Sequence, residues 1–90
     1  MPRFVIERTV PGVHRLNADA LKNLSHRSCE VLKELGPDIQ WVESYVTEDK
    51  LYCVYVAPSD ELIREHAKRG PFPADRVAKV KAVIDPTTAE

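Results

Sequence analysis

Residues 40–57 read QWVESYVTEDKLYCVYVA, and this stretch decides the fold. Two runs rich in Val, Tyr and Trp flank the polar tip at residues 47–50, a pattern typical of a β-hairpin. With Glu48-Asp49 as the loop, Tyr45 pairs with Tyr52, and successive side chains alternate between two faces. One predicted face carries Val42, Ser44, Val46, Leu51, Cys53 and Tyr55, and the other carries Trp41, Glu43, Tyr45, Tyr52, Val54 and Val56. The first face suits a covering layer of helices, and the second combines a carboxylate and phenols with apolar groups.

The segments around the hairpin have their own start and stop signals. Residues 3–10 alternate as a first strand that Pro11-Gly12 ends. An N-cap at Asn17 begins a helix that runs to about Leu35, and a second helix begins after Ser59 and ends at Gly70. Residues 76–85 alternate again and predict a last strand.

The predicted order is strand, helix, strand, strand, helix, strand. Right-handed crossovers then give an α+β protein of the ferredoxin-like βαββαβ type, with a four-stranded antiparallel sheet and two helices on one face. We expect a single domain over residues 1–90. The other sheet face would stay uncovered and expose Trp41, Tyr45 and Tyr52, so we expect a homodimer through this open face.

Composition excludes several classes of protein. Of the 90 residues, 43% are hydrophobic and 30% charged, which is ordinary for a soluble domain, and the net charge of −1 argues against binding nucleic acid by phosphate neutralisation. No apolar run is long enough for a membrane span or signal peptide, so we expect cytoplasmic residence and no membrane partner. Cys29 and Cys53 have no metal or redox spacing, and we expect two buried, reduced thiols.

The open face gathers the first candidate functional groups. Glu7 from the first strand joins Glu43, Tyr45 and Tyr52 from the hairpin, with two lysines of the last strand, Lys79 and Lys81, beside them. The carboxylates could bind a metal, act as general bases, or form structural ion pairs with the lysines.

His66 is the most informative single residue. It lies on the apolar side of the second predicted helix, where it is either a hydrogen-bonded core histidine or a metal ligand, since neutral imidazole is a common ligand of first-row metals. The sequence has no HExxH, nucleophile-elbow, P-loop or dinucleotide motif, so hydrolase, nucleotide-binding and dehydrogenase functions lack support.

Several short motifs resemble a family of small bacterial proteins catalogued as a domain of unknown function, among which nickel-binding members have been described. The motifs are Ile6-Glu7-Arg8, Ser44-Tyr45-Val46-Thr47, Tyr52-Cys53-Val54-Tyr55, Glu65-His66-Ala67 and Pro86-Thr87-Thr88. The resemblance covers nearly the whole chain. It implies a ferredoxin-like fold, a dimer and nickel binding.

Three functions remain open at this point. The first is a cytoplasmic homodimer that binds Ni²⁺ or another divalent metal for storage, buffering or sensing, with His66 and either Glu7 or Glu43 as ligands. The second is an enzyme or ligand-binding dimer, of oxygenase or isomerase type, in which Tyr45, Tyr52 and Trp41 contact a molecule on the open face. The third is a structural module with no ligand. We expect no catalytic residues for the first function.

Overall fold

Four strands and two α-helices follow one another along residues 1–90, all of which the computed structural model describes. The elements are β1 (Arg3–Thr9), η1 (Val13–Arg15), α1 (Ala18–Leu35), β2 (Gln40–Val46), β3 (Lys50–Val56), α2 (Asp60–Arg69), β4 (Arg76–Lys79) and η2 (Pro86–Ala89). Both short η elements are 3-10 helices.

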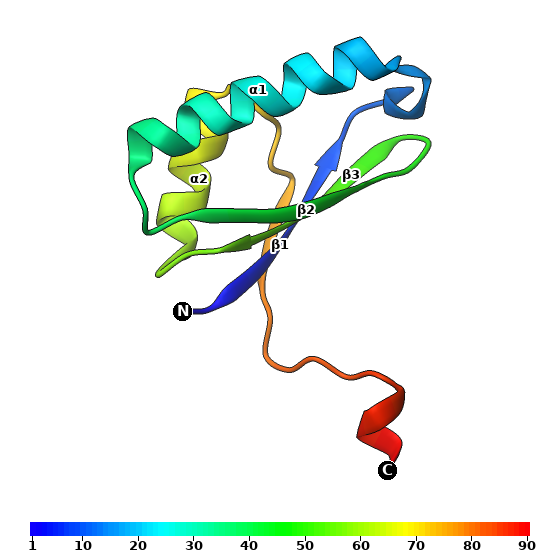
Figure 1. Ribbon diagram of the computed structural model, residues 1–90, viewed down its shortest axis with the longest axis vertical. Coiled ribbons are helices and arrows are strands. Elements are labelled where there is room, and N and C mark those ends of the chain that lie inside the picture. Colours follow the sequence, from blue (N-terminus) through cyan, green and yellow to red (C-terminus); the bar gives the residue numbers. More distant parts are fainter.

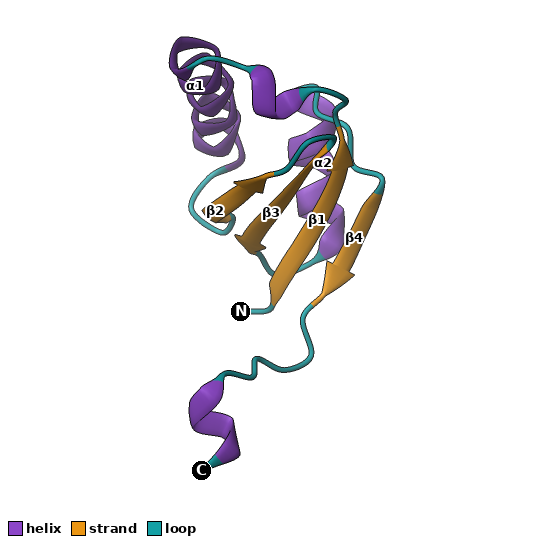
Figure 2. Cartoon of the chain, turned by 90° about the vertical axis from the view of Figure 1, so that its right-hand side faces the viewer, coloured by secondary structure: helices purple, strands orange, loops and turns teal.

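The strands form one antiparallel sheet in the order β2-β3-β1-β4 (Figure 2). Both helices pack on the same side of this sheet, and α1 crosses above the strands in Figure 1. The predicted ferredoxin-like arrangement is confirmed. Alternation along β1 buries Phe4, Ile6 and Arg8 beneath the helices and turns Val5 and Glu7 to the open face.

The helix ends follow the predicted signals. The Ala20 N–H donates to Asn17 Oδ1 at 2.8 Å, which caps α1, and Gly36 ends it with a φ of 93°. Ser59 is the N-cap residue of α2, although its side chain makes no capping hydrogen bond. At the other end of α2, a Cβ on Gly70 would collide with the Phe72 ring, so this position needs glycine. Neither α-helix combines the length and the apolar character that crossing a membrane requires.

The hairpin register is as predicted near the turn and different at its far end. Tyr45 pairs with Tyr52 and Glu43 with Val54, but a bulge places Trp41 opposite Tyr55 instead of Val56. The extra residue, Val42, is exposed. The prediction that Trp41 lies on the open face is therefore wrong, because the bulge turns its side chain under the helices, where it packs against the core.

The last strand is shorter than predicted. Regular pairing with β1 ends at Lys79, and the Val80 N–H makes one more bond, to the Arg3 carbonyl at 2.8 Å. Beyond this point the chain leaves the sheet, as Figure 1 shows, and Val83 and Ile84 are exposed. The register also puts Lys79 on the helix side of the sheet, opposite Phe4, so its predicted place on the open face is wrong.

The core lies between the sheet and the helices. Its buried members are Phe4, Ile6, Val13, Ile39, Leu51, Cys53, Tyr55, Ala57 and Ile63. Of the two free cysteines, Cys53 is buried as expected, but Cys29 is exposed on α1.

Candidate functional site

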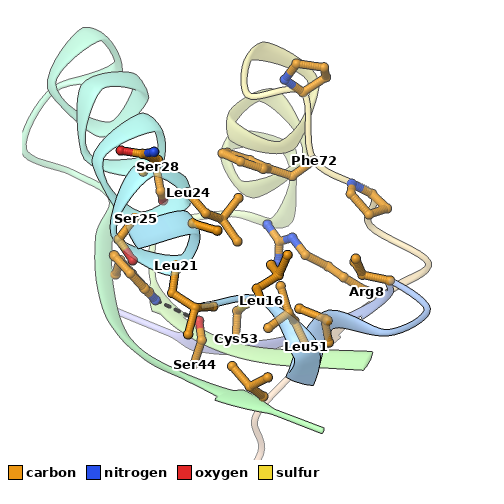
Figure 3. Close-up of a pocket in the computed structure, with 18 of the residues that line it drawn as sticks. Arg8, Leu16, Leu21, Leu24, Ser25, Ser28, Ser44, Leu51, Cys53 and Phe72 are labelled. Carbon is orange, nitrogen blue, oxygen red and sulfur yellow. Dashed lines mark hydrogen bonds between the residues drawn. The ribbon is translucent and has the colours of Figure 1, made fainter. Parts of the chain in front are cut away.

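A cavity of about 740 Å³ lies between the N-terminal half of α1 and the helix side of the sheet (Figure 3). Most of its lining is apolar and comes from η1, α1, both hairpin strands and the loop after α2. The apolar lining includes Leu16, Leu21, Leu24, Trp41, Val46, Leu51, Tyr55 and Phe72. Leu16 and Val46 are also exposed to solvent, so apolar side chains border the opening. This size and lining are typical of sites for small molecules.

Arg8 supplies the one charge in this cavity. Its side chain points inward from β1, among Leu16, Leu24 and Phe72 in Figure 3, and the residue is 3% exposed. Neither Nη1 nor Nη2 has a hydrogen-bond partner in the protein. The guanidinium carbon lies 5.8 Å from the ring centroids of both Tyr55 and Phe72, which are cation–π contacts. A buried charge without a counter-ion is costly, on the order of several kcal/mol.

His66 is fully buried beside this cavity. Its ring packs against those of Tyr55 and Phe72, with centroid distances of 5.1 and 5.4 Å. Nε2 shares a hydrogen bond with Ser28 Oγ at 3.2 Å, and Nδ1 has no partner. Burial, and secondly the charge of Arg8, lower the pKa of His66 to about 4. The imidazole is therefore neutral at physiological pH.

The open face carries the predicted carboxylates. Lys50 Nζ donates to Glu7 Oε1 at 2.6 Å, so Glu7 pairs with Lys50 and not with the lysines of the last strand. The hydrogen bond to Glu7 and its charge raise the pKa of Lys50. On β2, a hydrogen bond to Glu43 and the charge of that carboxylate raise the pKa of the exposed Tyr45 phenol.

The structure does not bring the predicted metal ligands together within one chain. Glu7 and Glu43 face away from the helices, whereas His66 lies beneath them, with the sheet between. No group of three or more His, Cys, Asp or Glu side chains is placed to hold a metal ion. His66, Glu7 and Glu43 therefore do not fit nickel as a single site in one protomer.

The predicted ligand-binding residues also lie on different faces of the sheet. Trp41 lines the cavity and its Nε1–H donates to Ser44 Oγ at 2.9 Å, whereas Tyr45 and Tyr52 lie on the opposite face and outside the cavity lining. The large cavity of this fold is thus on the helix side and not on the open face.

Arg8 was missed as a candidate by reasoning from the sequence, although a signal was present. It follows Phe4 and Ile6 at steps of two, which places a charged residue on the buried face of a strand. Arginine is rarely buried without a partner, so such a position suggests a ligand or an ion pair.

The fold and these two sheet faces define a small α+β protein with an apolar cavity on one side and carboxylates on the other. A sequence model described as "Nickel responsive protein SCO4226-like" matches residues 4–80, and the chain belongs to this family. It is also similar to the crystal structure of SCO4226 from Streptomyces coelicolor A3(2), with a TM-score of 0.76. The two are 19% identical over 91% of this chain and 99% of the other, which shows the shared fold. No curated protein matches the chain.

Proposed function

We propose that this protein binds Ni²⁺ as a homodimer and serves in nickel storage, buffering or sensing. The observation that carries the proposal is the family match over residues 4–80, because the family is described as nickel responsive. Binding of the ion by the protein itself is the simplest way to be responsive to nickel.

The arrangement of donors supports a site shared by two copies. One protomer holds no cluster of three donors, so its own carboxylates are too few to hold the ion. A two-fold interface doubles each donor, because the same residue enters from both subunits. Glu7 and Glu43 both project from the open face and are the donors we assign to this site.

The open face also has the composition of an interface. Val5, Val54, Val56 and Ala78 lie on it, none of them fully buried, and no layer of the protein covers them. Charged and phenolic groups, among them Glu43, flank this apolar strip. An apolar centre with a polar rim is typical of subunit contacts.

His66, the third predicted metal ligand, does not lie on the open face. Its neutral imidazole has a free Nδ1, but the sheet separates it from Glu7 and Glu43. It can therefore serve only a second position on the helix side, and it gives the proposal a discriminating variant.

The test is calorimetric titration of metal-free protein with NiCl₂, together with the mass in solution from light scattering. We expect a dimer that binds nickel, and we expect Glu43→Gln or Glu7→Gln to weaken binding about tenfold or more, as loss of a ligand should. Glu61→Gln, on the exposed side of α2, is the matched control and should change nothing.

Two outcomes contradict the proposal. Absence of heat with nickel at tens of micromolar, about the range of a weak specific site, would refute nickel binding by this protein. Loss of binding in His66→Asn, with both glutamate variants unaffected, would move the site from the open face to the helix side.

A further inference from the structure

We propose that the cavity beneath α1 is a binding site for a small organic monocarboxylate with an apolar body, its carboxylate held by Arg8. This inference does not rest on the proposed nickel function. It uses the opposite face of the sheet and a ligand of opposite charge.

The shape and lining of the cavity indicate the body of the ligand. A volume of about 740 Å³ falls within the range of small-molecule sites, roughly 300 to 1,000 Å³. Hydrophobic side chains, leucines and aromatic rings among them, form most of the wall, and two of them, Leu16 and Val46, are also exposed to solvent. Such walls favour an aliphatic or aromatic group over a sugar or a nucleotide.

The charge of the cavity indicates the head group. No acidic residue is among those that line it, and Arg8 is the one charged residue that does. Both terminal nitrogens of Arg8 lack partners, while the rings of Tyr55 and Phe72 contact the guanidinium without neutralising its charge. Two free, adjacent N–H groups on a rigid plane match the two oxygens of a carboxylate.

The remaining polar groups of the lining are few and neutral. Ser28 is engaged with His66, and Ser44 accepts from Trp41, so neither competes for Arg8. His66, neutral beside them, adds no second positive charge that would favour a dianion. A single cation in an otherwise apolar space therefore favours a monoanion.

The test compares a carboxylate with its neutral analogue in the absence of nickel. Calorimetric titration with 4-phenylbutanoate and with 4-phenylbutan-1-ol should show that the wild-type protein prefers the acid about tenfold or more, the usual difference for a charge-assisted hydrogen bond. Arg8→Met should remove this preference and keep the affinity for the alcohol. Arg64→Met, which removes an exposed arginine of α2, is the control and should behave as wild type.

A second variant tests whether the ligands bind in this cavity. Ala20→Trp places a large ring into the cavity from α1 and leaves Arg8 intact, so both ligands should lose binding while circular dichroism stays native. Equal affinity of the wild type for acid and alcohol, or no binding of either up to about a millimolar, would overturn the proposal. Retention of the preference in Arg8→Met, or of full binding in Ala20→Trp, would overturn it equally. Because chelated protein is used throughout, a failure here leaves the nickel proposal unaffected.

Discussion

Replacing Arg8 by methionine should stabilise the ligand-free protein, although Arg8 is one of its most buried residues. Most substitutions at buried positions destabilise, because they leave a cavity or an unsatisfied group. Arg8 differs because its own Nη1 and Nη2 are the unsatisfied groups. Methionine has a similar length and flexibility, so it keeps much of the packing of the arginine stem.

The magnitude follows from two opposing terms. Burial of an unpaired ion costs on the order of several kcal/mol. The contacts with Tyr55 and Phe72 recover roughly 0.5 to 2 kcal/mol each, and methionine loses them as cation–π interactions. The balance is a gain of about 1–3 kcal/mol, comparable to that measured when buried charges are replaced by apolar side chains. For a domain of this size the melting temperature should rise by roughly 5–15 °C.

The assay is urea denaturation of chelated protein at neutral pH, followed by circular dichroism, with thermal melts alongside. Arg64→Met is the control, because that side chain is 55% exposed and its loss should change the free energy of unfolding by less than about 0.5 kcal/mol. Destabilisation of Arg8→Met by more than about 1 kcal/mol would refute the reasoning, because it would show that the contacts of the guanidinium outweigh the cost of burying its charge. That result would also remove the main support for the carboxylate site, which is the unpaired charge of Arg8.

Two further predictions concern His66 and the C-terminal segment. The folded-state pKa of His66, about 4, lies below its unfolded value of 6.5, so the unfolded chain binds the proton more strongly. His66 therefore costs no stability above about pH 6.5 and up to about 3 kcal/mol as the pH falls toward 4. Urea denaturation at pH 7 and 4.5 should show a smaller loss in His66→Gln than in wild type, and equal losses would contradict the burial of a neutral ring. Deletion of residues 82–90, all exposed, should change the unfolding free energy by less than about 0.5 kcal/mol, and a loss above 1 kcal/mol would show that Val83 and Ile84 pack against something, such as a second copy.

The sequence predicted the fold because its signals were local and consistent. Asn17 and Gly36 delimit α1 in the way their chemistry requires, and alternation along residues 43–54 determines the register near the hairpin turn. The bulge at Val42 carries no such signal, because neither glycine nor proline marks it. One unpaired residue was enough to move Trp41 to the other face.

The predicted length of the last strand failed for a different reason. Alternation continues through Ile84, but a strand needs a partner, and β1 begins at Arg3. The bond from Val80 reaches Arg3, the first residue of that partner strand, so later residues lie beyond its end. The end of β4 thus depends on where β1 starts, and Arg3 precedes Arg76 by 73 positions in the chain. Residues 76–85 alone therefore do not reveal where the strand ends.

The separation of the two proposed binding sites follows from the alternation of β1. Glu7 and Arg8 are neighbours, so the strand turns one charge to each face of the sheet. The open face thereby carries carboxylates suited to a cation, and the cavity carries a guanidinium that would repel one. If nickel and a carboxylate bind as we propose, each site should respond to its own residue. We expect Glu7→Gln to weaken nickel binding alone and Arg8→Met to weaken carboxylate binding alone. A double variant should then show both losses and no more, because the two side chains share no partner across the sheet.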